Sequence, residues 1–392
     1  MNYILFDDYK RDNLLPLCYM RPVADIRFGI LTIREKWEHY LSTQTSSLTQ
    51  EYLRVKYPIK KMDDNILING SVCPNPELIK EIKSLKPNQA IVSDDQIIAM
   101  YIKGHDIESS EQSIEEEIKT ETNFLFIHDI WCIYSKNDEA IKQDFELITK
   151  GRKSLPISST NNILGGENIF IEDGALVEFC TINANTGPVY IGKDAEIMEG
   201  CNIRGPLALC EHSVLKMGAK IYGPTTIGPY CKIGGEVVNS VFFGYSNKAH
   251  DGFFGNSVIG EWCNIGADTN TSNLKNTYDI VKLWNYPRKT FVDTGMQFCG
   301  LIMGDHSKCG INTMFNTGTV VGVNVNVFGS GFQRNFIPSF SWGGTSGFSS
   351  YNIEKAFDVA EAVYKRRNMV FDKVEKDIMA SVYDVSFNFH TI

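Results

Sequence analysis

Residues 191–233 decide the fold of this chain, and they read IGKDAEIMEGCNIRGPLALCEHSVLKMGAKIYGPTTIGPYCKI. From Ile191 to Ile233 an aliphatic residue stands at every sixth position without a gap. A mostly small residue follows four places after each of them, as at Ala195 and Cys201. α-Helices and ordinary strands repeat about every 3.6 and 2 residues, so neither explains a period of six. The period is typical of a coil with three short flat sides, in which each hexad forms one side and one corner.

The same frame returns twice further along the chain, and sixteen hexads hold it in all. Glycine and asparagine supply the corners, because both tolerate positive φ angles. We therefore predict a left-handed parallel β-helix of hexapeptide repeats over about residues 165–335, with the aliphatic side chains stacked inside it. The later members of the frame are Phe253, Ile259, Ile265, Met303, Cys309, Phe315, Val321 and Val327.

Two stretches, residues 234–252 and 270–298, break the count of six. Both are rich in polar, basic and aromatic residues, unlike the coils around them. Insertions in a solenoid project as loops and commonly form its binding face. We therefore expect both stretches to project from the coils and to carry the function.

The regions on either side of the repeat do not show the six-residue period and have other sequence patterns. In residues 1–155 short apolar strands alternate with helical stretches, which predicts an α/β domain with a largely parallel sheet. After about residue 350, two segments show helical spacing. We predict three domains: an α/β domain at 1–155, the β-helix at 156–345, and C-terminal helices at 346–392 that pack on the β-helix or on a neighbouring subunit.

The composition limits the partners. A net charge of −9 argues against a general affinity for nucleic acid or for an anionic membrane surface. The first residues do not form a signal peptide, and no apolar run is long enough to cross a bilayer, so we expect a cytoplasmic protein. Of ten cysteines seven lie in the repeat region and none forms a CxxC pair, which indicates structural fillers.

The residues best suited to chemistry follow one another from Lys248 to Asn273. Histidine exchanges protons near neutral pH, so His250 beside a groove between β-helices can deprotonate an amine or hydroxyl that attacks a thioester. Asn264 and Asn273 are candidates for orienting the acceptor or the acyl carrier. The alternative is that His250 only fills a turn.

The string KAHDGFFGNSVIGEWCNIGADTNTSN, residues 248–273, resembles the acetyltransferase half of the bacterial bifunctional enzymes that make UDP-N-acetylglucosamine. The resemblance implies acetyl-CoA as co-substrate and an amino-sugar phosphate as acceptor. It places His250 on the catalytic base, Asn264 on a substrate-binding asparagine and Asn273 on an active-site asparagine. Phe253 stands where that family has a tyrosine that helps to hold the substrate.

Nearly the whole chain resembles a variant branch of this family, described as sugar nucleotidyltransferase-like. Residues 14–41, 256–276 and 299–322 carry its hallmark segments. The family's phosphate-binding arginine is missing, and Val238 or Asn239 replaces its lysine. Candidates for the missing cations are Lys248, Lys275, Lys282, Arg288 and Lys289.

Residues 1–155 depart further from the resemblance, which implies a nucleotidyltransferase that uses UTP or dTTP, a sugar-1-phosphate and Mg²⁺. Such enzymes hold the nucleotide phosphates with a glycine-rich loop, which this chain lacks. Arg11 and Arg21 are candidates for the basic residues that counter the triphosphate charge. Asn69 stands where the metal-binding aspartate is expected, with Asp7 and Asp8 as substitutes. An inactive or altered domain is an equal alternative.

Two other readings remain open at this point. The first is a catalytically degenerate homologue that binds a sugar nucleotide and regulates or scaffolds. The second is a zinc enzyme like the γ-class carbonic anhydrases, with His212, His250 and His306 as candidate ligands. Because a three-sided prism presents flat sides to its neighbours and groove sites of this fold lie between subunits, we expect a homotrimer.

Overall fold

A computed structural model describes residues 1–107 and 114–389 and divides into two compact units. The first unit contains residues 1–14, 20–26 and 31–130. The second contains residues 15–19, 27–30 and 131–392. The chain therefore passes between the units several times near its start, and residues 131–155 group with the β-helix. The domain bounds that the sequence suggests, with the first at residue 155, stay a proposal.

The first unit is built on one six-stranded sheet with the order β2-β1-β3-β5-β4-β6. Buried apolar residues such as Ile4, Leu67 and Met100 form a core cluster along it. The strands are β1 (Asn2–Phe6), β2 (Ser46–Leu48), β3 (Asp64–Asn69), β4 (Gln89–Ser93), β5 (Gln96–Lys103) and β6 (Glu116–Lys119).

This sheet is mixed, whereas the sequence predicted a largely parallel one. β1 pairs with β2 and β3 in parallel, and β4 pairs with β6 in parallel. β5 runs antiparallel to both β3 and β4. The reason is the tight turn at Asp94 and Asp95, where Asp94 has a φ of 49°. A turn of two residues can join only antiparallel strands.

The helices of the first unit follow the local signals of the sequence. Thr32 and Glu35 form a capping box at the start of α1 (Ile33–Leu41), and Asn75 caps α2 (Pro76–Ser84). Short 3₁₀ helices complete the unit: η1 (Arg11–Leu14), η2 (Val23–Asp25) and η3 (Glu51–Leu53).

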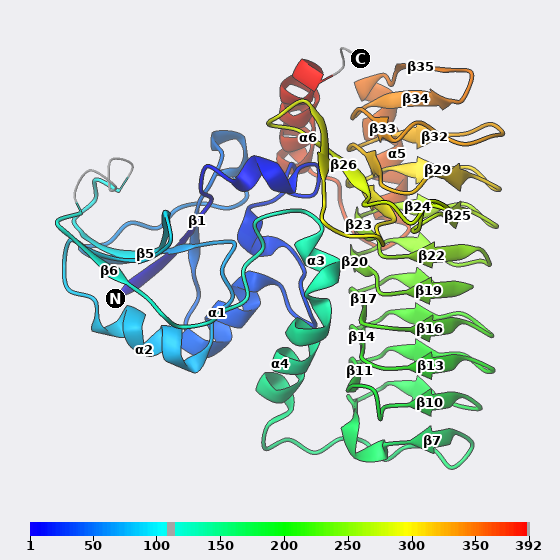
Figure 1. Cartoon of the computed structure of the whole chain (residues 1–392), viewed down its shortest axis with the longest axis horizontal. Coiled ribbons are helices and arrows are strands. Elements are labelled where there is room, and N and C mark those ends of the chain that lie inside the picture. The colour runs from blue at the N-terminus through cyan, green and yellow to red at the C-terminus, as the bar shows by residue number, and fades with distance from the viewer. Residues whose placement is uncertain (108–113, 390–392) are drawn as a thin grey trace. The chain divides into compact units, whose positions relative to one another are not determined.

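The second unit contains the parallel β-helix that the six-residue period predicts (Figure 1). In its described residues three sheets of eight, nine and ten strands form the three sides of successive coils. The first sheet contains β7 (Asn162–Leu164), β10 (Thr181–Asn183), β13 (Asn202–Arg204), β16 (Lys220–Tyr222), β19 (Glu236–Val238), β22 (Phe253–Gly255), β25 (Asn270–Thr271) and β30 (Met314–Phe315).

The second and third sheets have the same in-register parallel pairing, except that the last strand of the third sheet, β35, runs antiparallel to β34. The second sheet contains β8 (Ile169–Ile171), β11 (Val189–Ile191), β14 (Leu207–Leu209), β17 (Thr225–Ile227), β20 (Val241–Gly244), β23 (Val258–Glu261), β28 (Leu301–Met303), β31 (Thr319–Val321) and β33 (Phe336–Ile337). The third contains β9 (Leu176–Val177), β12 (Glu196–Ile197), β15 (Val214–Leu215), β18 (Lys232–Ile233), β21 (Asn247–Lys248), β24 (Asn264–Ile265), β29 (Lys308–Cys309), β32 (Asn326–Val327), β34 (Ser341–Gly344) and β35 (Gly347–Ser350).

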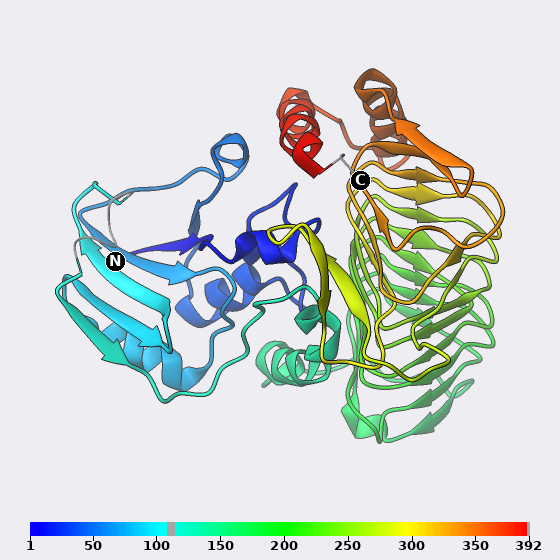
Figure 2. The same ribbon diagram turned by 45° about the horizontal axis from the view of Figure 1, so that its top comes forward.

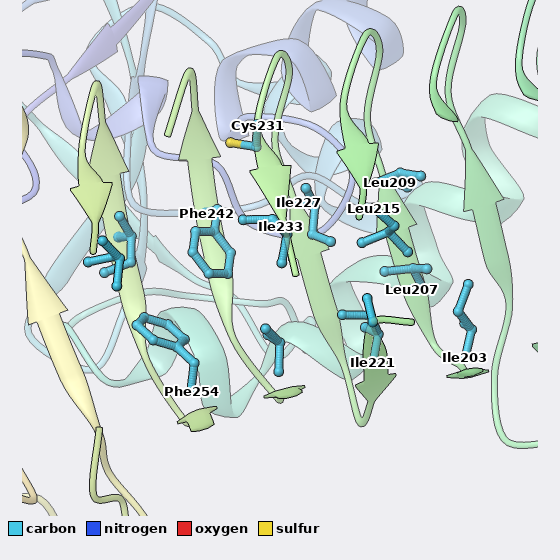
Figure 3. Packing of buried hydrophobic residues seen from close by; sticks show 14 of the residues in the cluster. Ile203, Leu207, Leu209, Leu215, Ile221, Ile227, Cys231, Ile233, Phe242 and Phe254 are labelled. Carbon is cyan, nitrogen blue, oxygen red and sulfur yellow. The ribbon is translucent and has the colours of Figure 1, made fainter. Parts of the chain in front are cut away.

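The predicted aliphatic residues fill the inside of the coils, where each stacks on its counterpart one coil away (Figure 3). Ile191, Leu209 and Ile227, for example, are paired in register and fully buried. One position of the predicted frame is wrong by a residue. Phe254, not Phe253, points inward, because it pairs with Val237 of the preceding coil.

The first interruption, residues 234–252, does not project as a loop, and that prediction is wrong. It forms a further coil from β19, β20 and β21. The inner residues of this coil are Val237, Phe242 and Lys248, spaced by five and six positions, so the corners are shorter than elsewhere. A search for an aliphatic residue at every sixth position misses this coil.

The second interruption, residues 270–298, does project. It contains the antiparallel hairpin of β26 (Lys282–Asn285) and β27 (Thr290–Asp293), which lies outside the coils and is coloured yellow in Figures 1 and 2. Near its turn, the ring of Trp284 stacks on Phe336 of the second sheet with centroids 4.3 Å apart, which holds the hairpin against the coils.

Helices from both ends of the second unit pack on the β-helix. α4 (Asn137–Thr149) follows α3 (Cys132–Ser135), and Asn137 Nδ2 donates to Thr226 Oγ1 at 3.1 Å. After the coils come α5 (Ile353–Lys365), α6 (Lys373–Ser386) and the 3₁₀ helix η6 (Phe387–Phe389); another, η5 (Gly166–Asn168), lies in the first coil. All ten cysteines are buried and free of disulfides. Of the helices in the described part of the chain, none is long and apolar enough to cross a membrane.

Candidate functional site

His250 lies at the corner between the third and first sheets, just after β21 and before β22, and is exposed. Its neighbours along this corner, one coil before and one coil after, are Gly235 and Ala267. A Cβ added to Gly235 would lie 2.9 Å from the His250 carbonyl oxygen, so this corner requires glycine. The imidazole is therefore flanked by residues with no side chain or only a methyl group, which leaves it accessible.

Lys248 is turned into the β-helix and is only 1% exposed. It takes the inner position that Ile233 occupies one coil earlier, and its Nζ donates to the carbonyl oxygens of Gly234 (3.1 Å) and His250 (2.8 Å). Burial lowers the pKa of its ammonium to about 8, and nearby Asp251 opposes that shift. Its interpretation as a substrate-binding cation is therefore corrected: Lys248 anchors the main chain of the His250 corner.

Phe253 and Asn273 are brought together on the first sheet over Gly255. A Cβ at Gly255 would lie 2.6 Å from Asn273 Nδ2 and 2.8 Å from the Phe253 ring, so only glycine fits beneath them. Asn273 Nδ2 donates to Asn256 Oδ1 at 2.8 Å. Both asparagines lie at the end of the first sheet opposite to His250. The predicted site residues thus mark the two ends of one side of the coil.

Asn264 is exposed on the outer face of the third sheet, around the corner from Phe253 and Asn273. It lines a pocket with a volume of about 500 Å³, which we call the basic pocket. Ala249, the residue before His250, lines the same pocket. Its other lining residues are Lys232, Tyr245, Asn247, Trp262, Cys263, Lys308, Val363, Arg366 and Arg367.

Four cations of the basic pocket were missed by the sequence reasoning: Lys232, Lys308, Arg366 and Arg367. The cations that the sequence favoured lie mostly elsewhere. Lys275 Nζ donates to the Ile280 carbonyl, and Lys282 lies 3.8 Å from Asp293 across the projecting hairpin. The outer row of Lys232, Asn247, Asn264 and Lys308 becomes visible only after the coils are counted correctly.

In the first unit, Asp7 is fully engaged by protein groups. Its Oδ1 accepts from Val23 N at 2.8 Å, its Oδ2 accepts from Thr49 Oγ1 at 2.5 Å, and Arg11 Nε lies 3.5 Å away. Burial raises the pKa of this carboxyl to about 6, while the Arg11 charge and the hydrogen bonds oppose the shift. Asp7 therefore has no side open to a metal ion.

Arg11 and Arg21, the candidate phosphate-binding residues, are each only 4% exposed. Arg11 Nη1 forms an ion pair with Asp12 at 2.9 Å, and its Nη2 donates to Tyr52 Oη at 3.2 Å. These contacts turn the guanidinium of Arg11 toward protein groups. The assignment of Arg11 and Arg21 to nucleotide binding stays a prediction, and the burial of both side chains does not favour it.

Comparison with known proteins finds similarity to sugar nucleotidyl transferases and to GlmU proteins. Residues 3–153 match the family described as sugar nucleotidyl transferase. The bifunctional protein GlmU of Picosynechococcus sp. is 29% identical over 157 residues, which cover 39% of this chain and 28% of the relative. The GlmU of Methanocaldococcus jannaschii is 31% identical over 140 residues, covering 36% of this chain and 29% of the relative. Part of the chain is thus similar in sequence to the GlmU proteins.

The chain spans less than a third of the length of these two GlmU proteins. Among solved structures, the polySia specific acetyltransferase NeuO aligns with 49% of this chain and 83% of its own length, at 13% identity and a TM-score of 0.25. The GlmU likeness agrees with the resemblance that residues 248–273 indicate.

Mg²⁺ is the ion that the sequence predicts at Asn69 and Asp8, which lie close together. Asn69 Nδ2 donates to Asp8 Oδ2 at 3.0 Å, and Gln96 Nε2 donates to the same oxygen. Asn69 Oδ1 accepts from Ser71 N at 2.9 Å. The amide N–H groups of Asn69 and Gln96 thus already occupy Asp8 Oδ2, and the Asp7 carboxylate is engaged by other protein groups. As folded, this donor set fits Mg²⁺ poorly.

The zinc alternative finds no support within one chain. His212 and His306 both lie at the corner between the second and third sheets, whereas His250 lies at the next corner. His212 stacks on Tyr230 with ring centroids 4.7 Å apart, and His306 lies against Tyr364 at 6.2 Å. Among residues 1–107 and 114–389, no three His, Cys, Asp or Glu side chains are grouped so that they could hold a metal ion.

Proposed function

We propose that the β-helix transfers an acetyl group from acetyl-CoA to the amino group of an amino-sugar phosphate, with His250 as general base. The observation that carries the proposal is the His250 corner: an exposed imidazole, flanked by Gly235 and Ala267, on a main chain anchored by Lys248. The likeness to proteins named bifunctional GlmU supports the same reaction.

In the proposed reaction the amine nitrogen attacks the thioester carbonyl carbon, and His250 accepts the proton that the nitrogen loses. The tetrahedral intermediate then collapses, the C–S bond breaks, and the CoA thiolate leaves and takes up a proton. Asn264 and Asn273 are proposed to orient the two substrates, and Phe253 to contact the sugar. Lys248 acts as a positioning residue, because it touches the main chain of His250 and no substrate.

The test is release of free CoA from acetyl-CoA when the full chain is given glucosamine 1-phosphate or another amino-sugar phosphate. A general base contributes about 10²–10⁴-fold, so His250→Ala should lower kcat by that factor. The matched control is His105→Ala, an exposed histidine of the first unit, which should leave kcat unchanged. If the wild-type chain releases no CoA with any amino-sugar phosphate, the proposal is wrong.

A second candidate function belongs to residues 3–153, because they match the sugar nucleotidyl transferase family. We propose that this part binds UTP or dTTP and transfers the nucleotidyl group to a sugar-1-phosphate, with release of pyrophosphate. The test is pyrophosphate release by the full chain in the presence of Mg²⁺. Nucleotide binding without pyrophosphate release would favour the degenerate, regulatory or scaffolding homologue instead.

We also propose a homotrimer in the cytoplasm. Its support is a line of apolar side chains along the corner that carries His250: Phe179, Met217 and Ile311 are 64%, 70% and 70% exposed. Exposed apolar side chains aligned in this way are typical of a surface that another subunit covers. Light scattering at several concentrations should give three times the mass of 44.2 kDa, and a monomer would contradict the proposal. Cell fractionation tests the location.

A further inference from the structure

The basic pocket gathers cations from two separate elements of the second unit. Its floor is the outer row of the third sheet, where Lys232, Asn247, Asn264 and Lys308 are paired in register on four successive coils. Strands lie about 4.8 Å apart, so this row spans roughly 14 Å with a lysine at each end and two carboxamides between. Its wall is the C-terminal turn of α5, with Val363, Arg366 and Arg367.

The position of α5 beside this row is set by an aromatic ladder. Tyr230, Tyr245 and Trp262 stack at one corner of successive coils, with centroids 5.0 and 4.2 Å apart. Tyr364 of α5 continues the ladder by stacking on Trp262 at 4.0 Å. Arg367 Nη2 then donates to the Tyr230 carbonyl at 3.0 Å. The helix is thus fixed so that its last turn faces the lysines.

The charges of the pocket are not balanced by the protein. None of the four cations lies within 4.0 Å of a carboxylate in the described part of the chain, and the side chains of Lys232 and Arg366 make no hydrogen bond there. Lys308 Nζ has one hydrogen bond, to the His306 carbonyl at 2.7 Å. Burial, together with the like charges of Arg367, Lys216 and Arg366, lowers the pKa of Lys232. A C-terminal helix dipole explains arginines at the end of α5, but not the two lysines of the β-helix.

Four like charges are costly to bring together, and this chain has 47 acidic residues against 38 basic ones from which to balance them. An anion in the pocket would relieve the repulsion and form charge-assisted hydrogen bonds with guanidinium and ammonium groups. The two carboxamides, Asn247 and Asn264, add neutral donors and acceptors for sugar hydroxyls. Ala249 places the pocket beside the main chain of His250.

We propose that the basic pocket binds the phosphate group of a phosphorylated substrate and takes the place of the phosphate-binding arginine and lysine that this sequence lacks. The proposal deepens the proposed acetyl transfer and rests on it for the identity of the ligand. Two sources share the chemistry: the phosphate of the acceptor sugar and the phosphates of CoA.

The experiment measures binding by isothermal titration calorimetry to the full chain. One probe is glucose 1-phosphate, which has the phosphate but no amino group and so cannot accept an acetyl group. The other probe is CoA. The variant is Lys232→Gln/Arg366→Gln, because both side chains are exposed and hold no other part of the protein. The matched control is Lys193→Gln/Lys365→Gln, which removes two exposed charges outside the pocket.

Each lost charge-assisted hydrogen bond weakens binding by about tenfold or more, so the pocket variant should bind its phosphate ligand about 100-fold more weakly. The control should stay within about twofold of the wild type. Loss confined to glucose 1-phosphate assigns the pocket to the acceptor, and loss confined to CoA assigns it to the donor; both results support the pocket. If the pocket variant binds both probes as well as the control does, the proposal is overturned.

This test separates the pocket from the proposed acetyl transfer. His250→Ala should bind both probes like the wild type, because the imidazole does not line the pocket. If the chain binds glucose 1-phosphate through Lys232 and Arg366 but transfers no acetyl group, the proposed pocket stands and the proposed acetyl transfer is wrong. If the Lys232→Gln/Arg366→Gln variant transfers acetyl groups as well as the wild type does, the proposed acetyl transfer stands and the proposed pocket is wrong.

Discussion

The two units of this protein use the same residue types in opposite ways. In the first unit, Arg11 and Asp7 are buried and contact each other, and their remaining polar atoms are directed at protein groups. In the second unit, Lys232 and Arg366 are exposed, face a common pocket and have no protein partner among the described residues. Sequence reasoning assigns Arg11 to a nucleotide phosphate and overlooks Lys232 and Arg366, whereas only the latter two of these three are exposed in the structure.

The two sets of charges differ in what they stabilise: the first set stabilises the fold, and the second is placed to stabilise a bound anion. A buried ion pair compensates its own desolvation, so removing one partner strands the other in a low-dielectric environment. Exposed like charges that converge without a partner do not help the fold, and their natural use is to bind an anion. Substitutions should therefore affect stability in the first unit and ligand binding or catalysis in the second.

The largest effect should come from Arg11→Met. This change leaves the Asp7 carboxylate buried without its cation, which typically costs about 3–5 kcal/mol. Urea unfolding followed by circular dichroism should show the transition of the first unit at lower urea. The comparison partner is His250→Ala, an exposed corner position, which should change the free energy of unfolding by less than about 0.5 kcal/mol. Equal stability of the two variants would mean that the ion pair of Arg11 with Asp7 does not stabilise the first unit, and the contrast between the units would fail.

The next effect concerns Lys248, a charged residue of the second unit whose side chain is buried, as those of Arg11 and Asp7 are in the first unit. With the pKa of the ammonium lowered to about 8, the folded state holds its proton less tightly than the unfolded chain does. The unfolded chain therefore binds more protons between about pH 8 and 10.5, and stability from this group rises with pH in that window. Below pH 8 the full penalty of the buried charge is present.

Lys248→Met fills the same space without the charge. At pH 7 we expect it to raise the free energy of unfolding by about 1–3 kcal/mol, with the difference shrinking toward pH 10. The carbonyls of Gly234 and His250 lose their donor, so kcat for acetyl transfer should fall while KM changes little. Thermal unfolding at pH 7 and 10, beside steady-state kinetics, measures both. A variant that is less stable at pH 7 and fully active would show that Lys248 is a structural residue only.

The sequence predicts the scaffold far better than the site, and particular residues show why. Ile191 and the aliphatic residues at every sixth position after it fix the coils, because most inner positions are apolar and the corners leave little room. The coil at 234–252 escapes that pattern, since Lys248 takes an inner position and the corners shorten. His250, Asn264 and Asn273 are named by a resemblance, but their places at two different corners and on an outer face depend on the coil count.

The basic pocket could not be predicted at all from local patterns. Lys232 and Lys308 are 76 positions apart in the chain, and they lie close enough to share a pocket because the hairpin within 270–298 adds no coil between them. From the sequence alone, Arg366 and Arg367 are expected to be solvated residues in the last turn of a helix. Their direction is set by the stacking of Tyr364 on Trp262, a contact between segments about a hundred residues apart. Tertiary packing, not residue type, turns these charges toward one another.

The smallest effect should distinguish Lys308 from the exposed cations beside it. Burial lowers the pKa of the Lys308 ammonium to about 8, so in the free protein this group loses its proton as the pH rises from 7 to 9. A bound phosphate favours the protonated form, and binding above pH 8 must therefore take up part of a proton. Glucose 1-phosphate is fully ionised in this range, because the second pKa of a phosphate ester is about 6.

We therefore expect the affinity of the wild-type chain for glucose 1-phosphate to fall about three- to tenfold between pH 7.5 and 9. Lys308→Gln should bind more weakly at pH 7.5 and lose most of this pH dependence, whereas Arg366→Gln should bind more weakly and keep it. Calorimetry in two buffers of different ionisation enthalpy measures the proton uptake directly. If the wild type takes up no proton at pH 8.5, Lys308 does not contact the phosphate, and the anion lies toward the α5 end of the pocket.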